Sequence, residues 1–362
     1  MLDRAAPLPL EERHRLIGLQ AGRGAAAMLV AAYHASRMLD LPQYLGYAPL
    51  GGVLSWGHAG IDFFFVLSGY IITHAHAADV GRPDRLGRYA WRRFTRIYPT
   101  YWVVTAVAIV LALFSPERGS RLEPGHLLAS LLLLPHDQWP LIGVAWTLEH
   151  EVLFYIVFGV AIWRPVLGMG LGAAALGLVA VATWVPLTGI LAFLSDAYHV
   201  EFVLGIAVAV LLRRVVVPLP RTLAALGLAA FLAIGAAECA GLVGVNGAAG
   251  RLLYGTASAA MLLGLVAAEQ RRLLHFGKAA ALLGAASYAL YLVSTLSIGV
   301  LAKLAVRLGL MAVAPGWLVL AVIAVLTLVA GIATYWIVER PLLAWLRDLS
   351  HRRQRLLPRS VG

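Results

Sequence analysis

Residues 23–34 read RGAAAMLVAAYH, and they place two ionisable residues at the ends of an apolar, helix-compatible run. Eleven positions on an α-helix make three turns plus about 20°, so Arg23 and His34 project from one face, about 16 Å apart along the axis. Ionisable groups at membrane depth are costly and usually face a protein interior or a wet cavity. We therefore expect this pair to line a functional pocket.

The composition of the whole chain indicates an integral membrane protein. Of its 362 residues, 61% are hydrophobic and 13% are charged, whereas soluble proteins carry about 25% charged residues. The formal net charge of +11 does not predict binding of nucleic acid, because no soluble module and no basic surface interleaved with aromatic residues accompanies it. The single cysteine, Cys239, excludes an intramolecular disulfide framework and a cysteine-rich metal site.

Long apolar segments predict an all-α fold, a polytopic membrane protein with about ten transmembrane helices. Each segment has the roughly 17 to 25 residues that a bilayer crossing takes, and the run at 126–135 adds an interfacial or re-entrant candidate. The N-terminal residues show no short apolar region followed by a small-residue cleavage site, so no cleaved signal peptide is expected. We expect the spans at 16–39, 53–74, 97–115, 142–163, 166–187, 198–213, 220–242, 250–268, 281–304 and 317–340.

The basic residues predict the orientation of these spans. All but six of the 29 Lys and Arg residues fall on the side of the two termini, so the positive-inside rule makes both termini cytoplasmic. The predicted cytoplasmic loop at 75–96 carries Arg93 and Arg96, one helical turn apart. We divide the chain into a transmembrane domain, 1–345, and a basic cytoplasmic tail, 346–362, whose amphipathic pattern suits a surface of anionic lipid.

The ionisable residues within the spans sort by depth into two layers. Arginines lie toward the cytosol, where an anionic, phosphate-bearing donor would meet them first. Histidines and carboxylates lie in the outer half. The cytosolic layer contains Arg23, Arg92, Arg93 and Arg96, and the outer layer contains His34, Asp62, Glu149, His150, Glu151, His199 and Glu201.

The segment WTLEHEVLFY, residues 146–155, offers two carboxylates that lie about 200° apart on a helix, so they cannot both face one pocket. We favour Glu151, because Thr147 and Tyr155 share its face of the helix. Glu149 is assigned to the outer interface, and Glu201 to solvent near a span end. Histidine spacing in the chain does not match helical metal ligands, so no metal site is expected.

Five segments, in order along nearly the whole chain, resemble the acyltransferase-3 family of polytopic membrane acyltransferases, which modify bacterial surface sugars and some lipids or antibiotics. The first is the family's motif of an arginine, ten residues and a histidine, at Arg23 and His34. The others are AGIDFFFVLSGYII (59–72), RRFTRIYPTYW (92–102), WTLEHEVLFY (146–155), and the closing pair SYALYLVS (287–294) and VERPL (338–342).

Three departures from the family pattern stand out. Ser294 occupies a position where many relatives have a histidine, so no acid or base role is carried onto it. Gly22 replaces the bulky apolar residue that commonly precedes the motif arginine. The chain lacks the extracytoplasmic esterase-like domain that is fused to some relatives, so it would deliver the acyl group itself or work with a separate partner.

The resemblance implies an O-acyltransferase in the bacterial cytoplasmic membrane. It would move an acyl group, most simply acetyl, from cytosolic acyl-CoA, a donor substrate rather than a bound cofactor, to a hydroxyl of a surface polysaccharide or other glycoconjugate. Polysaccharide-assembly proteins are candidate partners. From the residues we expect Arg23, Arg93 and Arg96 to hold the donor and His34 to act as general base or acyl carrier. Glu151 or Asp62 would orient the imidazole.

A different class of function is also compatible with these residues. In a proton-coupled transporter or glycan flippase, Asp62, Glu151 and His34 would form a proton relay. Transporters commonly contain inverted repeats with interrupted helices, and the sequence shows none. A non-catalytic membrane scaffold leaves the shared face of Arg23 and His34 unexplained.

Overall fold

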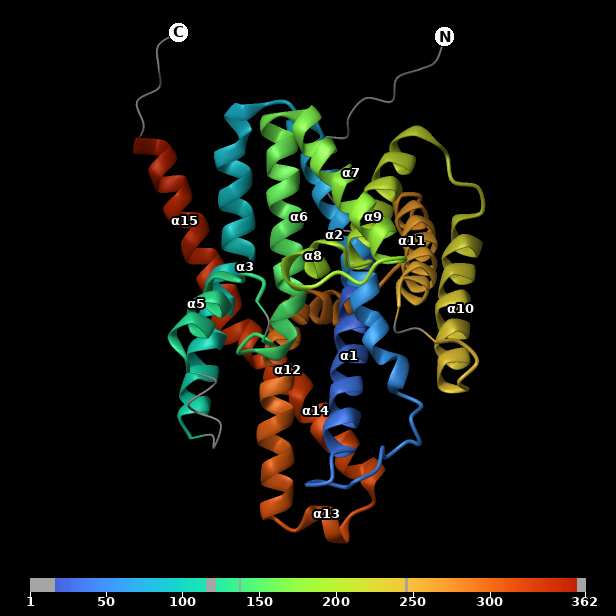
Figure 1. Cartoon of the computed structure of the whole chain (residues 1–362), viewed down its shortest axis with the longest axis vertical. Coiled ribbons are helices and arrows are strands. Elements are labelled where there is room, and N and C mark those ends of the chain that lie inside the picture. Colours follow the sequence, from blue (N-terminus) through green and yellow to red (C-terminus); the bar gives the residue numbers. More distant parts are fainter. Residues whose placement is uncertain (1–16, 115–121, 137, 245–246, 357–362) are drawn as a thin grey trace.

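The apolar segments of the sequence form helices that run between the two ends of an elongated molecule (Figure 1). The computed structural model describes residues 17–114, 122–136, 138–244 and 247–356, and within these ranges the regular structure is helical with no strand. This confirms the predicted all-α class.

The predicted spans are confirmed in number. Nine helical segments of the described chain are long and apolar enough to cross a membrane, and they correspond to nine of the ten expected spans. The tenth is α1 (Ile17–Leu39), which has 23 residues and is less apolar because Gln20, Arg23 and His34 lie on it. A helix of this length extends about 35 Å, enough for the hydrocarbon core of a bilayer.

Two helices at the centre of the molecule carry most of the residues discussed below. The first, α1, makes its most extensive contacts with α12 (Lys278–Arg307), and α2 (Gly60–His76) makes its own with α9 (Tyr198–Arg214). The remaining helices are α3 (Leu86–Leu113), α5 (Pro124–Leu132), α6 (Trp146–Trp163), α7 (Pro165–Ala182), α8 (Gly189–Leu194), α10 (Pro220–Cys239), α11 (Ala248–Gln270), α13 (Leu310–Val313), α14 (Gly316–Thr334) and α15 (Arg340–Leu356).

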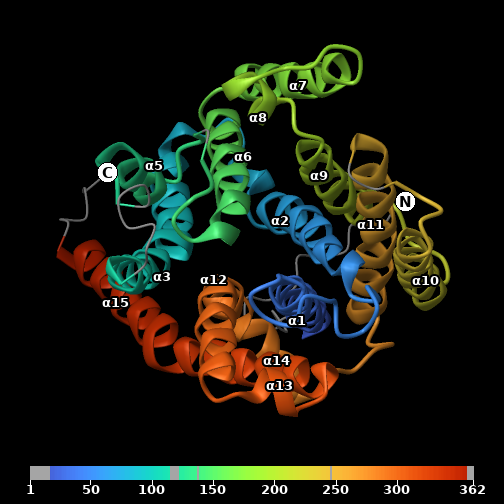
Figure 2. The same ribbon diagram turned by 60° about the horizontal axis from the view of Figure 1, so that its bottom comes forward.

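Seen from one end, the helices form a ring (Figure 2). Around its middle lie α1, α2, α3, α6 and α12, while α7, α10 and α15 lie on the periphery. Side chains that point to the middle from five separate segments can therefore meet in one place.

Glycines allow the two central helix pairs to approach closely. A Cβ atom at Gly284 of α12 would lie 2.2 Å from the Gln20 carbonyl oxygen of α1, and one at Gly69 of α2 would lie 2.1 Å from the Phe202 carbonyl oxygen of α9. Small residues serve this purpose generally in membrane helix packing. The close α1–α12 contact fixes the position of Arg23, one turn after Gln20.

Helix α3 begins earlier than the sequence predicted. We expected a loop at 75–96 and a span from 97, but α3 starts at Leu86 and contains Pro99 within it. The arginines of the predicted loop therefore stand on helical turns with fixed directions. Proline is tolerated inside a helix at the cost of one backbone hydrogen bond. We had placed the start of the helix near Pro99, because proline is common in the first turn of a helix.

The apolar run at 126–135 is neither a span nor a re-entrant loop. It forms α5, a nine-residue helix that is too short to cross a bilayer and is tied to the side of α3. Three side chains of α3 donate hydrogen bonds to the last carbonyl groups of α5, where a helix leaves backbone acceptors short of partners. These bonds are Tyr98 to Leu132 at 3.0 Å, Tyr101 to Ser130 at 2.6 Å, and Trp102 to Leu131 at 2.9 Å.

The C-terminal part of the described chain is one nearly continuous helix. Five residues in π-helical geometry, Tyr335–Glu339, join α14 to α15. A π turn accommodates one extra residue and is found mostly at functional sites, and here it lies directly before Pro341, which lacks a backbone donor. The helix runs through the expected domain boundary at 345, and residues 357–362 of the predicted tail lie outside the described residues.

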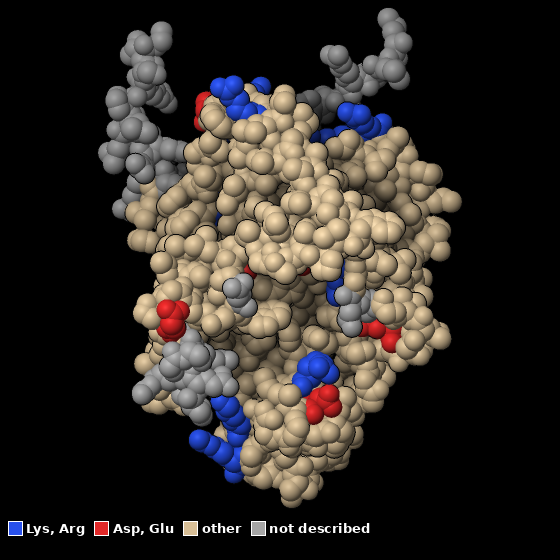
Figure 3. Space-filling view, viewed as in Figure 1, with Lys and Arg blue, Asp and Glu red and all other residues tan. Residues whose placement is uncertain are grey.

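Most of the side face of the molecule is uncharged (Figure 3). Lys and Arg side chains gather at its upper and lower ends, and a hollow opens in the middle of the face. This distribution suits a protein that spans a bilayer, because charged side chains avoid the hydrocarbon layer.

Candidate functional site

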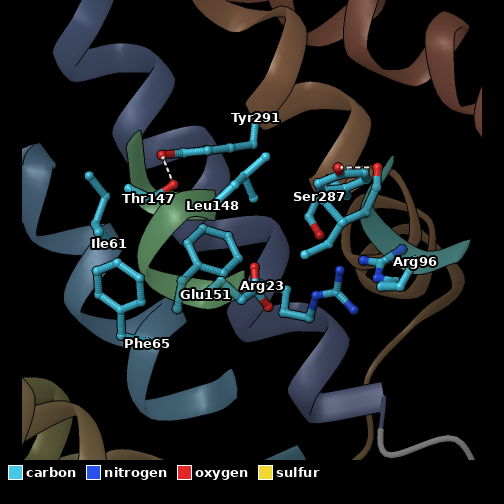
Figure 4. Close-up of a pocket in the computed structure, with 12 residues that line it drawn as sticks. Arg23, Ile61, Phe65, Arg96, Thr147, Leu148, Glu151, Ser287 and Tyr291 are labelled. Carbon is cyan, nitrogen blue, oxygen red and sulfur yellow. Dashed lines mark hydrogen bonds between the residues drawn. The ribbon is translucent and has the colours of Figure 1, made fainter. Parts of the chain in front are cut away.

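A pocket lies where α1, α2, α3, α6 and α12 meet (Figure 4). Its walls combine apolar side chains with a small set of ionisable and hydroxyl groups, the composition expected of a ligand site. The apolar walls are Ile61, Phe64, Phe65, Ile97 and Leu148, and the polar groups are Arg23, Arg96, Thr147, Glu151, Ser287, Tyr288 and Tyr291. We call it the Arg23 pocket.

Arg23 reaches the pocket from α1 and makes no hydrogen bond or ion pair within the described part of the chain. The charges that act on it most are those of Arg96, Glu339 and Glu151. In Figure 4 its guanidinium group and that of Arg96 both point into the pocket. A guanidinium group has five donors in a fixed fork that matches phosphate and carboxylate, so an unpaired one beside a cavity indicates an anionic or strongly polar ligand.

Arg96, in contrast, is held by the protein. Its Nη1 donates to Glu339 Oε1 at 2.9 Å, and its guanidinium lies over the ring of Tyr288, 5.0 Å from the centroid. Glu339 is 1% exposed and comes from the π turn before α15. The RRFTRIYPTYW and VERPL segments, which the sequence separates by more than 200 positions, therefore meet in one ion pair.

Glu151 lines the same pocket from α6. Its Oε1 accepts a hydrogen bond from Ser68 of α2 at 2.9 Å and a second, short one from Tyr155, one turn along α6. The predicted stripe of Thr147, Glu151 and Tyr155 is therefore real. Thr147 bonds to the Tyr291 hydroxyl at 2.8 Å, which fixes α6 against α12.

Arg93 does not join the other two arginines. Its guanidinium lies over the ring of Tyr155, 5.6 Å from the centroid, and it lines a separate groove between α3 and α6. The positions 93 and 96 differ by about 60° around the helix, so the two side chains take different sides of Tyr155.

His34 lies three turns along α1 from Arg23 and does not line the Arg23 pocket. It is half-buried, and its ring packs at 5.1 Å from that of Tyr33. Within the described residues it makes no hydrogen bond, so the structure does not bring it to Glu151 or Asp62. Among the described residues, the structure therefore shows no hydrogen bond through which Glu151 or Asp62 would orient the imidazole, as the sequence predicted.

Asp62 belongs instead to a second cluster of buried charges. It is fully buried and accepts two hydrogen bonds from Arg251 Nη1, at 2.8 and 3.2 Å. His58 bonds to Glu238 at 2.8 Å, and Tyr254 donates to the other oxygen of Glu238 at 2.7 Å. Arg251 joins the two halves through a 3.4 Å contact to His58. We call these five residues the Asp62 network.

Two carboxylates that the sequence assigned to water are buried. Glu201 is fully buried beside Asp62, and the two carboxyl groups are close enough to share a hydrogen bond. Glu149 is 6% exposed, and His136 Nδ1 lies 3.8 Å from its Oε1. Both predictions were wrong because residues near the end of a span can still be covered by a neighbouring helix.

Sequence reasoning missed Arg251 and Glu339 as members of these clusters. Arg251 was counted only as one of six basic residues on the outer side. Like Asp62, however, an arginine within an apolar span indicates a paired or functional site. Glu339 stood inside a quoted motif without a role. In the part of the chain that the structure describes, no three His, Cys, Asp or Glu side chains gather in a metal-binding arrangement.

Among the curated proteins similar to this chain, two have names that refer to polysaccharides. The exopolysaccharide production protein ExoZ of Rhizobium meliloti is 35% identical over 115 residues, 30% of this chain and 35% of the relative. The peptidoglycan O-acetyltransferase OatA of Listeria monocytogenes is 32% identical over 111 residues, 29% of this chain and 16% of the relative. The chain thus matches about a third of the first relative's length and a sixth of the second's.

A third relative, protein 2 in the picA locus of Rhizobium radiobacter, is 28% identical over 167 residues, 40% of this chain and 81% of the relative. No solved structure matches the chain significantly. The model of the acyltransferase-3 family, described as an acyltransferase domain, matches residues 16–336. This range includes both arginines of the pocket, His34 and Glu151, and the chain belongs to the acyltransferase-3 family.

Proposed function

We propose that this protein transfers an acyl group, acetyl in the first instance, from cytosolic acyl-CoA to a hydroxyl of a surface polysaccharide or other glycoconjugate. Membership of the acyltransferase-3 family supports acyl transfer, and the names of two relatives, an exopolysaccharide production protein and a peptidoglycan O-acetyltransferase, support a glycan acceptor. The bacterial cytoplasmic membrane is the place where such a donor and acceptor meet.

The observation that carries the proposal is the unpaired Arg23 beside a cavity that Arg96 also faces. Acyl-CoA bears phosphate groups, and paired guanidinium groups bind phosphate through strong, charge-assisted hydrogen bonds. The donor phosphates would bind at Arg23 and Arg96. The pantetheine arm would then extend along α1, and the roughly 16 Å to His34 is a distance that the extended arm can cover.

At His34 the chemistry needs one proton transfer. The imidazole removes the proton of the acceptor hydroxyl as its oxygen attacks the thioester carbonyl, the C–O bond forms, the C–S bond breaks, and the proton passes to the departing CoA thiolate. A thioester is already activated, so a positioned base in a water-poor site supplies most of what the step requires. His34 makes no hydrogen bond to the described protein, which leaves its ring nitrogens free for the acceptor.

The two predicted carboxylates take other roles in this proposal. Glu151, held by Ser68 and Tyr155, lies close enough to act on the charge of Arg23 and keeps that side chain in the pocket between turnovers. Asp62, bonded to Arg251, fixes the start of α2 against α11. Both are positioning residues rather than direct partners of the imidazole.

Acyl transfer is preferred to proton-coupled transport for two reasons. The family model covers most of the chain, and both carboxylates of the Asp62 network, Asp62 and Glu238, have partners within it. A relay for protons requires groups that exchange partners, whereas an Asp62–Arg251 pair with two hydrogen bonds resists such exchange.

The proposal is tested with purified protein in nanodiscs, acetyl-CoA labelled in the acetyl group, and polysaccharide from the host as acceptor. Wild type should transfer label to the polysaccharide, and His34→Ala should lose transfer by at least about 100-fold while still binding acetyl-CoA. Arg37→Ala, an exposed arginine on the same helix that pairs with Asp40, is the matched control. Full transfer by His34→Ala would contradict the assignment of the base.

A further inference from the structure

A second groove lies between α3 and α6, outside the Arg23 pocket. Its walls are apolar side chains together with Tyr89, Tyr98, Tyr155 and Arg93. Helices α3 and α6 pack against each other (Figure 2), and two lining residues, Ile156 and Trp163, are 58% and 48% exposed. In a membrane protein these exposed apolar residues face lipid, so the groove opens to the bilayer.

Among the described residues that line this groove, Arg93 is the one with a charged side chain, and it has no counterion in the described part of the chain. It makes no ion pair or hydrogen bond within the described residues, and its Nε atom is buried without a partner. Its contact with the protein is the face of the Tyr155 ring. The guanidinium therefore has N–H donors without a partner in the described protein, in a groove with apolar walls.

The other polar groups of the groove are already satisfied by the protein. The Tyr89 hydroxyl donates to the Tyr155 carbonyl at 2.9 Å, the Tyr98 hydroxyl to the Leu132 carbonyl at 3.0 Å, and the Tyr155 hydroxyl to Glu151. An occupant therefore meets one free cation and apolar walls. A hydrocarbon chain with a phosphate fits these conditions, whereas the amide groups of a pantetheine arm would find no partner.

We propose that the α3–α6 groove binds a membrane lipid with an anionic phosphate headgroup, with the phosphate at Arg93 and one acyl chain along the groove. Charge complementarity extends beyond Arg93, because the exposed Arg88 and Arg92 stand on neighbouring turns of α3 and attract anionic lipid. Ile97 lines both cavities, so the bound chain lies against the wall of the Arg23 pocket. The site is defined by lipid binding and does not depend on the acyl-transfer reaction.

The test uses Trp163, which lines the groove, as a reporter. The full-length protein is reconstituted in vesicles of phosphatidylcholine that contain increasing fractions of chain-brominated phosphatidylglycerol or chain-brominated phosphatidylcholine. Quenching at Trp163 is taken as the difference between wild type and Trp163→Phe. We expect phosphatidylglycerol to be preferred over phosphatidylcholine by roughly fivefold, the effect of one arginine at a membrane surface.

Variants locate the site. Arg93→Gln should abolish the preference, and Arg92→Gln, whose exposed side chain lies outside the groove, should keep most of it. Gly159→Leu should fill the groove and reduce quenching by both lipids, whereas Gly159→Ala, whose Cβ would lie 3.4 Å from the Tyr89 ring, should retain quenching. Free inorganic phosphate should not compete with the lipid.

Three results would overturn the proposal. Equal quenching by the two brominated lipids in wild type would remove the headgroup preference. An equal loss in Arg92→Gln and Arg93→Gln would assign the preference to the general positive field of α3. An increase in KM for acyl-CoA in Arg93→Gln, with the lipid preference unchanged, would place Arg93 at the donor instead.

Discussion

The Arg23 pocket and the Asp62 network both contain charges buried among apolar helices, but they differ in how those charges are compensated. In the Asp62 network the arginine gives two hydrogen bonds to a carboxylate, and a histidine and a tyrosine share a second carboxylate. In the Arg23 pocket, Arg96 has a partner, whereas Arg23 has none among the described residues. We infer that the paired charges of the Asp62 network hold helices together, whereas the unpaired guanidinium of the Arg23 pocket binds a ligand.

The largest expected effect comes from breaking the closed cluster. Arg251→Met leaves the fully buried Asp62 without its counterion, and removing one member of a buried ion pair costs about 3–5 kcal/mol. We expect a large loss of thermal stability in detergent, measured by fluorescence-detected size-exclusion chromatography after heating. Adding Asp62→Asn should recover most of the loss, because the uncompensated charge is gone. An unchanged melting temperature in Arg251→Met would show that the network is not structural.

An intermediate effect is expected at Glu339, which holds Arg96 at the pocket. Glu339→Gln replaces the ion pair with a hydrogen bond from the Arg96 guanidinium to a neutral amide, a loss of about 1 kcal/mol or more. We expect KM for acyl-CoA to rise by roughly fivefold or more with a smaller change in kcat, because Arg96 would be positioned less well. Glu123→Gln, at the exposed start of α5, is the control. Equal kinetics in both variants would remove Glu339 from donor binding.

A smaller effect is expected at Tyr155, which donates to Glu151. Tyr155→Phe removes one hydrogen bond, worth about 1 kcal/mol, so transfer should fall by roughly fivefold. Combining it with Ser68→Ala should show coupling, since both hydroxyls bond to the same carboxylate oxygen. The coupling is measured as a double-mutant cycle on kcat/KM. Strict additivity would mean that the two hydroxyls do not act through Glu151.

The smallest effect is expected at Ser294, where many relatives have a histidine. Its hydroxyl donates to the Tyr291 carbonyl of its own helix at 2.8 Å, so Ser294→Ala should change transfer by no more than about twofold. A loss above tenfold in the same assay would give this position a part in the chemistry.

Much of the fold could be predicted from the sequence, because membrane-spanning helices are recognised by their length and hydrophobicity. Nine of the ten expected spans meet that criterion in the structure, and α1 is recognisable as a helix even though its ionisable residues lower its hydropathy. The start of α3 could not be predicted, because its first turns carry arginines and glycine in place of an apolar face, and because Pro99 resembles a helix start.

The candidate site was predictable in its members and less so in its contacts. Arg23, Arg96 and Glu151 line one pocket, although Glu151 was expected in the outer layer with His34, apart from the arginines. The partners Glu339 and Arg251 were not expected, since an ion pair between distant segments depends on how the helices are arranged around the ring. The direction of Arg93 was also beyond the sequence, because a difference of about 60° around a helix decides between two cavities.

The central claim is that Arg23 is unpaired because it binds the phosphates of the donor, and binding of acetyl-CoA tests it most directly. The measurement is calorimetric titration of acetyl-CoA into wild type, Arg23→Ala and Arg37→Ala in the same detergent, with melting temperatures taken in parallel. Loss of a charge-assisted hydrogen bond, about 1.5–3 kcal/mol, predicts a Kd roughly 10- to 100-fold higher for Arg23→Ala, with an unchanged melting temperature and wild-type binding in Arg37→Ala. Unchanged binding in Arg23→Ala would contradict the account.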